Sequence, residues 1–200
     1  METIRYTKMD IDHIISVLID GGIVAFPTDT VFGLASNMDE DAMNRIYEAK
    51  GRSFEKALPM MCDSYEMISR VAEVNDETKK IIEAFMPCPL TIFFNKKYIV
   101  PDYVTNGKKT IGIRVPDDEF ILELIRKMNA PLMVTSANIS GDGSLLKWED
   151  VYACMNGRID AIVCEDARGD KASTIIDVTD GIRVLRDGPL SLKEIKEILE

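Results

Sequence analysis

Histidine is nearly absent from this chain of 200 residues, in which His13 stands alone. A nucleophile paired with a histidine base, as in Ser-His or Cys-His enzymes, is therefore not recognisable in the sequence. Cysteine is sparse as well, and Cys62, Cys88, Cys154 and Cys164 form no CxxC pair and have no histidine nearby. This spacing argues against a metal site and predicts free, mostly buried thiols.

Long apolar runs are also missing. The first ten residues carry charges of both signs and lack the apolar stretch of a signal peptide. The longest apolar runs elsewhere have the length of a β-strand, which is too short to span a bilayer. We therefore expect a cytoplasmic protein that does not contact membranes.

Positively charged residues are scarcer than negatively charged ones. The chain has 24 Lys and Arg residues and 34 Asp and Glu residues, which gives a formal net charge of -10. Such a chain repels polyanions at long range, so a phosphate-bearing ligand has to be held by local cations. Lys50 and Arg52 offer a point charge and a forked set of donors two residues apart. Gly51 ends a predicted helix here, so we expect both cations on a solvent-accessible loop. The alternative is an ordinary solvated pair, since Lys-x-Arg is common on surfaces.

Apolar residues follow both helical and strand spacing along the chain. Helices are predicted over 11–20, 39–49, 65–71, 76–85, 118–128, 148–155 and 192–199. Strands are predicted over 23–26, 58–62, 90–94, 110–115, 131–135, 161–164, 173–178 and 182–185, and a polar turn over 27–34. No linker, repeat or low-complexity segment interrupts this mixture, and 46% hydrophobic residues suffice for one core. The sequence predicts a single α/β domain over residues 1–200.

A second polar cluster, Thr135-Ser136-Ala137-Asn138-Ile139-Ser140-Gly141, follows the strand predicted over 131–135. Ligands of α/β proteins bind at the carboxyl ends of strands, and hydroxyl and amide groups there can bind a phosphate or a sugar. A turn that caps a helix uses the same residue types, so both readings stay open on local grounds.

Seven short motifs are spread over nearly the whole chain: Pro27-Thr28-Asp29-Thr30-Val31-Phe32-Gly33-Leu34, Lys50-Gly51-Arg52, Pro89-Leu90-Thr91, Gly112-Ile113-Arg114-Val115-Pro116, 135–141, Ser173-Thr174-Ile175-Ile176-Asp177 and Leu185-Arg186-Asp187-Gly188. In these motifs and their order, the chain resembles the YrdC-like family. The resemblance implies a twisted mixed sheet flanked by helices, with a concave, positively lined ligand-binding face. It also implies a threonylcarbamoyl-AMP synthase, which joins L-threonine, bicarbonate and ATP and releases pyrophosphate. The product serves the threonylcarbamoylation of tRNA adenosine by a downstream transferase complex.

The same resemblance implies roles for individual residues. Lys50 and Arg52 would hold the ATP phosphates and stabilise charge during the reaction, and Ser136, Asn138 and Arg186 would contact the nucleotide. Arg114 would pair with the threonine carboxylate, while Thr28, Thr30 and Ser173 would shape that end of the cavity. Mg²⁺ is expected to arrive with ATP and to be held by phosphate oxygens and water, without a protein metal site.

Several positions depart from the family pattern. Phe32 replaces a tyrosine, Ser53 and Ala57 replace prolines of the loop after Arg52, and Met86-Pro87-Cys88-Pro89 replaces a Trp-Pro-Gly-Pro segment. The loop should be less stiff without its prolines. The segment 58–63 is similar to the YciO branch, which often lacks the Ser-x-Asn pair found here.

Two other functions are compatible with parts of the sequence. A YciO-like paralogue could bind a nucleotide, tRNA or double-stranded RNA, and Lys96-Lys97 and Lys108-Lys109 could form a local basic patch for it. The overall acidity argues against this interpretation. Carbamoyl transfer, as in the related domain of hydrogenase-maturation proteins, is disfavoured because the zinc-finger and acylphosphatase segments of those proteins are not present.

Overall fold

Helices and strands are mingled along the chain in the computed structural model, which describes residues 2–198. The helices are α1 (Ile11–Ile19), α2 (Glu40–Lys50), α3 (Tyr65–Val71), α4 (Asp76–Phe85), α5 (Glu119–Met128), α6 (Trp148–Met155) and α7 (Leu192–Glu197), with two 3-10 turns, η1 (Lys8–Asp10) and η2 (Asp102–Thr105). The strands are β1 (Ile4–Tyr6), β2 (Val24–Phe26), β3 (Gly33–Ser36), β4 (Met60–Met61), β5 (Leu90–Asn95), β6 (Thr110–Arg114), β7 (Leu132–Ser136), β8 (Ala161–Val163), β9 (Thr174–Asp177) and β10 (Arg183–Arg186).

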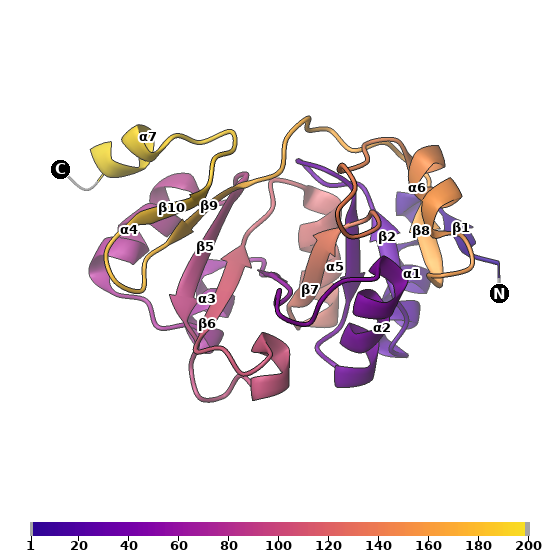
Figure 1. The fold of residues 1–200 in the computed structure, drawn as a ribbon, viewed down its shortest axis with the longest axis horizontal. Coiled ribbons are helices and arrows are strands. Elements are labelled where there is room, and N and C mark those ends of the chain that lie inside the picture. Colours follow the sequence, from indigo (N-terminus) through magenta and orange to yellow (C-terminus); the bar gives the residue numbers. More distant parts are fainter. Residues whose placement is uncertain (1, 199–200) are drawn as a thin grey trace.

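The strands form one 10-stranded sheet in the order β1-β8-β2-β3-β7-β4-β6-β5-β9-β10. Its two edges, β1 and β10, lie toward opposite ends of the molecule (Figure 1). The pairs β1/β8, β2/β8, β4/β6 and β5/β9 are parallel, and the remaining neighbours are antiparallel. The mixed α/β sheet that the sequence predicted is therefore confirmed. The short strand β4 links β7 to β6 near the middle of the sheet.

Local sequence signals explain where the helices begin and end. Asp39 caps α2 by accepting from the backbone N–H groups of residues 41 and 42, at 3.0 and 3.1 Å. Gly51 then ends α2 in the left-handed conformation, with a φ of 59°. Asp118 caps α5 in the same way, and Asn129 ends it with a φ of 49°. Asparagine tolerates this conformation better than most residues with a side chain.

The core is continuous across the sheet and its covering helices. Strands β2 and β8 are buried at every position, as expected for strands covered on both faces. Phe26 of β2 meets Phe120 of α5 edge to face, with ring centroids 6.4 Å apart. Helix α5 also contacts α1. No helix within residues 2–198 is long and apolar enough to cross a membrane.

Two strands were not predicted. These are β1, at Ile4–Tyr6, and β3, at Gly33–Ser36, whose first two residues belong to the segment 27–34 that was interpreted as a polar turn. β3 consists of Gly-Leu-Ala-Ser, which has little intrinsic strand preference. It is a strand because β2 and β7 bond to its two edges. Tertiary pairing, which is invisible to local patterns, therefore decides the structure of this segment.

Candidate functional site

A cavity of about 380 Å³ opens where β3, β5, β6, β7 and β9 come together. This size is typical of small-molecule sites. Apolar and hydroxyl side chains form much of the lining, and Ser136 lies there at the end of β7, as predicted. The charged side chains that the described part of the chain contributes to the lining are all basic: Arg52, Lys56, Lys108, Arg114 and Arg186. An acidic protein thus presents a local site for an anion.

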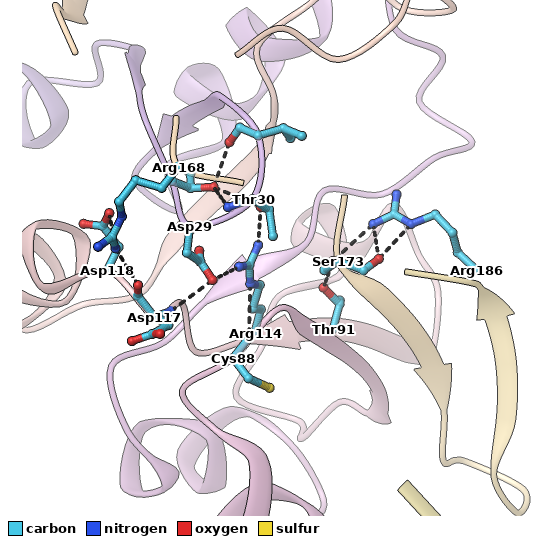
Figure 2. Close-up of polar contacts among 12 residues, drawn as sticks. Asp29, Thr30, Cys88, Thr91, Arg114, Asp117, Asp118, Arg168, Ser173 and Arg186 are labelled. Carbon is cyan, nitrogen blue, oxygen red and sulfur yellow. Dashed lines mark hydrogen bonds and ion pairs between the residues drawn. The ribbon is translucent and has the colours of Figure 1, made fainter. Parts of the chain in front are cut away.

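Arg114 at the end of β6 is fixed at one side of the cavity by three polar partners (Figure 2). Its Nη2 forms an ion pair with Asp29 Oδ2, its Nη1 donates to Thr30 Oγ1 at 2.8 Å, and its Nε donates to the Cys88 carbonyl at 3.3 Å. Burial lowers the pKa of Arg114, while the neighbouring Asp29 raises it. Since a guanidinium has five N–H groups, one remains on each terminal nitrogen for a ligand.

The hydroxyl groups beside Arg114 have little freedom. Thr28 Oγ1 donates to the Val31 carbonyl at 2.7 Å, accepts from the Thr30 N–H at 3.0 Å and lies 2.9 Å from Thr30 Oγ1. With its proton committed to Val31, Thr28 must accept the proton of Thr30 and is then saturated. Thr30 accepts from Arg114 and keeps one lone pair. Thr30 can therefore accept a hydrogen bond from a ligand, whereas Thr28 acts by holding Thr30.

A segment over residues 164–173 connects β8 to β9 and passes over the Thr28–Thr30 turn (Figure 2). The backbone N–H of Arg168 donates to the Thr28 carbonyl at 3.0 Å, and its guanidinium donates to the Asp117 carbonyl and to Asp118 at 2.7 and 3.0 Å. At Gly169 a Cβ would lie 2.4 Å from the carbonyl oxygen of Thr30, so no side chain fits there. No local sequence pattern predicts this contact.

Ser173 and Arg186, which were expected at the threonine and adenylate ends respectively, are in contact on the other side of the cavity (Figure 2). Arg186 donates to the Ser173 carbonyl from Nε at 3.0 Å and from Nη2 at 2.8 Å, and to its hydroxyl at 3.1 Å. The Ser173 hydroxyl also lies 2.8 Å from Thr91 Oγ1. Burial and the charge of Arg114 lower the pKa of Arg186.

The expectation that Lys50 lies on an exposed loop is wrong. Lys50 is the last residue of α2, is only 1% exposed and does not line the cavity. Its Nζ donates to the carbonyl of Ser136, to the carbonyl of Asn138 at 2.6 Å and to Asn138 Oδ1 at 3.4 Å. Burial, with a contribution from Arg52, lowers the pKa of Lys50 to about 8. Its ammonium thus binds the turn after β7 from within the protein.

Asn138 is buried in the same contact and likewise does not line the cavity. Its two amide N–H groups donate to the carbonyls of Ile139 and Asp142, both at 2.8 Å. The 135–141 segment thus has two parts, because Ser136 lines the cavity while the Asn138 side chain closes a turn.

Arg52 does lie on a loop and lines the cavity. It folds along its own loop, where Nε donates to the Lys56 carbonyl at 3.0 Å and Nη2 to the Ala57 carbonyl at 3.2 Å. Lys56 and Lys108 join it in the lining, and neither was predicted as a site residue. Lys108 had been noted only as part of a surface pair, because nothing local shows that its turn reaches the cavity.

Asp29 is the other functional candidate that the motifs did not single out. It neutralises Arg114, and its second oxygen, Oδ1, is the one buried side-chain polar atom within residues 2–198 without a hydrogen-bond partner. The described residues contain no group of three or more His, Cys, Asp or Glu side chains that could hold a metal ion.

The fold and the cavity together define an α/β protein with a basic cavity at its mixed sheet. A family model for the Sua5, YciO and YrdC proteins, described as telomere recombination, matches residues 16–188. The chain belongs to this family, which confirms the resemblance found in the motifs.

Relatives and solved structures place the chain within that family. The threonylcarbamoyl-AMP synthase of Pyrococcus abyssi is 38% identical over 184 residues, which cover 90% of this chain and 54% of the relative. A protein of Methanocaldococcus jannaschii described as a putative threonylcarbamoyl-AMP synthase is 36% identical over 181 residues, covering 89% of this chain and 85% of the relative. The crystal structure of P. abyssi Sua5 complexed with L-threonine has a TM-score of 0.91 and 34% identity, covering 99% of this chain and 60% of that one. The chain thus spans little more than half the length of the P. abyssi synthase.

Proposed function

We propose that this protein is an L-threonylcarbamoyladenylate synthase, a nucleotidyltransferase that makes threonylcarbamoyl-AMP and pyrophosphate from L-threonine, bicarbonate and ATP. The observation that carries the proposal is the basic cavity, which joins a hydroxyl-lined end around Arg114 to a loop that bears Arg52 and Lys56. Relatives described as this synthase support it. The product would serve tRNA modification through a downstream threonylcarbamoyl-transferase, in the cytoplasm.

The threonine would bind at the Arg114 end. The two N–H groups left on the guanidinium can receive its carboxylate, and Asp29 and Thr30 fix their direction. The remaining lone pair of Thr30 can accept from the amine or the hydroxyl of threonine. Ser173 completes the wall of this pocket. The structure of P. abyssi Sua5 complexed with L-threonine supports threonine as the ligand.

The reaction needs two bonds to form. The threonine amine attacks bicarbonate, loses a proton and yields a carbamate and water. A carbamate oxygen then attacks the α-phosphorus of ATP, and the bond from that phosphorus to the β-phosphate oxygen breaks, so that pyrophosphate leaves with the electron pair. Arg52, Lys56 and Lys108 would face the leaving phosphates, while Ser136 and Arg186 would contact the adenylate. The enzyme would act by positioning and by charge stabilisation.

Lys50 and Asn138 need a different role from direct phosphate contact. For Lys50 to reach ATP, its bonds to the Ser136 and Asn138 carbonyls would have to open, and for Asn138 those from its amide to the Ile139 and Asp142 carbonyls. We therefore assign Lys50 to positioning, since it fixes the turn that places Ser136 in the cavity.

Mg²⁺ fits this cavity as a companion of ATP rather than as a resident ion. The charged lining is basic, and the described residues offer no metal-binding cluster. When bound, the ion would neutralise part of the phosphate charge. Phosphate oxygens and water would be its ligands, and no side chain of the cavity is assigned to it.

The deciding experiment is pyrophosphate release by the purified protein with ATP and bicarbonate, with and without L-threonine. We expect release that depends on threonine. The test variant is Arg114→Gln, which removes the proposed contact to the threonine carboxylate. It should raise the KM for threonine more than the KM for ATP. Confirmed ATP binding without threonine-dependent release would refute the synthase proposal and make RNA binding, with its steep salt dependence, the next property to measure.

A further inference from the structure

The loop that carries Lys56 into the cavity contains no proline or glycine between Ser53 and Ala57. It has no regular secondary structure, and its ring, Phe54, is 53% exposed. Within the loop, the Lys56 N–H donates to the Ser53 carbonyl and the Glu55 N–H donates to Ser53 Oγ, both at 3.2 Å, and Arg52 donates to the Lys56 and Ala57 carbonyls. These local bonds do not tie the loop to the rest of the fold, so contacts from outside the loop decide where its side chains are aimed.

One set of contacts comes from a turn at Asn106, which lies 52 residues after Phe54 in the sequence. Helix α2 and the 3-10 turn η2 are in contact. Asn106 and Gly107 follow the end of η2 at Thr105 and have φ values of 53° and 75°. Asparagine and glycine are the residues that accept two such positions. The turn directs Asn106 Nδ2 to the Phe54 carbonyl, and Lys108 Nζ donates to the Glu55 carbonyl at 2.5 Å.

A second set of contacts comes from α2. The Tyr47 ring is buried and stacks on Phe54, with ring centroids 4.4 Å apart. Its hydroxyl accepts from Asn106 Nδ2 at 2.9 Å and donates to the Lys56 carbonyl at 3.3 Å. Consecutive loop carbonyls at 54, 55 and 56 are thus bonded by Asn106, Lys108 and Tyr47 respectively.

We infer that Asn106 is a positioning residue that clamps the cavity loop 53–57 in the conformation that aims Arg52 and Lys56 at the phosphates of the ligand. The role in turnover rests on the proposed function, whereas the clamp itself does not. Asn106 is central because its amide joins both sets of contacts, one to the loop backbone and one to the tyrosine that bonds the next carbonyl. It does not line the cavity, so it acts through the loop.

The clamp can be tested with Asn106→Ala, and Asn129→Ala is the matched control. Asn129 also ends a helical element in the left-handed conformation, but it follows α5, which contributes nothing to the cavity lining. Both variants carry the same backbone strain, and only one loses contacts to the loop. Tyr47→Phe provides a second variant that keeps the ring stack and removes only the hydroxyl contacts.

The first readout is trypsin cleavage after Arg52 and Lys56 in the folded protein, which reports how often the loop opens. Losing a hydrogen bond that orders the loop should increase opening roughly 3- to 10-fold in Asn106→Ala and in Tyr47→Phe, but not in Asn129→Ala. The second readout is kinetic: the KM for ATP should rise by a similar factor in both clamp variants, while the KM for threonine stays unchanged.

Cleavage of Asn106→Ala at the rate of Asn129→Ala would overturn the clamp. Faster cleavage with an unchanged KM for ATP would overturn the positioning role. If the wild-type protein releases no pyrophosphate at all, the synthase proposal fails, and the cleavage rates together with calorimetric ATP affinity still decide whether the clamp exists and orders the site.

Discussion

Replacing Lys50 with methionine should reduce stability, whereas the same change at Arg52 should reduce ATP binding. Lys50→Met keeps a long apolar side chain but removes the ammonium that three oxygens of Ser136 and Asn138 accept from. The carbonyls of these two residues then lose their buried donor. A buried polar group left unpaired costs about 1–3 kcal/mol.

The expected loss follows from two opposing effects. Two unpaired carbonyls favour unfolding. Removal of the buried charge favours folding, because burying the Lys50 ammonium costs free energy, as its lowered pKa indicates. The net decrease in the free energy of unfolding should be about 2–3 kcal/mol, because the first effect involves two groups. In a chain of this length this corresponds to a decrease in Tm of about 4–12 °C.

Arg52→Met is the matched control. The Arg52 guanidinium contacts only the Lys56 and Ala57 carbonyls of its own loop, so its loss should change the free energy of unfolding by less than about 1 kcal/mol. Its KM for ATP should rise instead. Urea unfolding followed by circular dichroism, together with ATP kinetics, measures both quantities. A Lys50→Met protein as stable as the wild type, with an ATP defect equal to that of Arg52→Met, would refute the buried placement of Lys50 and restore it to the phosphate site.

Three further outcomes can be measured on the same protein. Asp29→Ala leaves the Arg114 charge buried without its partner and should reduce the free energy of unfolding by about 3–5 kcal/mol in urea titrations; an unchanged midpoint would contradict the ion pair. Gly169→Ala places a Cβ against the Thr30 carbonyl and should raise the KM for threonine. An equal KM for threonine in the variant and the wild type would show that the 164–173 segment moves aside without disturbing the site. The pKa of Lys50 is lowered from 10.5 to about 8, so between these pH values the unfolded chain binds more protons than the folded one. The free energy of unfolding of the wild type, relative to that of Lys50→Met, should therefore rise across pH 8 to 10.5, by up to about 1.4 kcal/mol per pH unit. A flat difference over that range would contradict the shifted pKa.

Much of the fold was predictable because most elements carry their own signals. The helices Tyr65–Val71, Asp76–Phe85 and Trp148–Met155 have the predicted bounds. Ser64 and Asn75 cap the first two, whereas the third begins without a side-chain cap and follows its apolar spacing alone. The strand Gly33–Ser36 was missed because its stability comes from pairing with neighbours. Within the site, Arg114, Ser173 and Arg186, which the motifs singled out, line one cavity, and their roles in ligand binding stay predictions.

The placement of Lys50 could not be predicted, for a different reason. A lysine before a glycine at the end of a helix is normally solvated, and the local sequence agrees with that expectation. What buries it is the turn after β7, whose carbonyls come from residues 86 and 88 positions further along the chain. Lys56 and Lys108 were missed similarly, since only the assembled loop and turn bring them to one cavity.

The position of β8 in the sheet has a consequence for how the protein is made. β8, at Ala161–Val163, lies between β1 and β2 and is the partner strand of β1, which begins at Ile4. A ribosome that adds about 5–20 residues per second needs on the order of ten seconds to proceed from β2 to β8. During that time β2 can pair with β3 as a hairpin, but its other edge and its apolar faces stay open. The end of the sheet that is synthesised first is therefore completed late, and the nascent chain exposes a strand edge to chaperones until residue 163 has emerged.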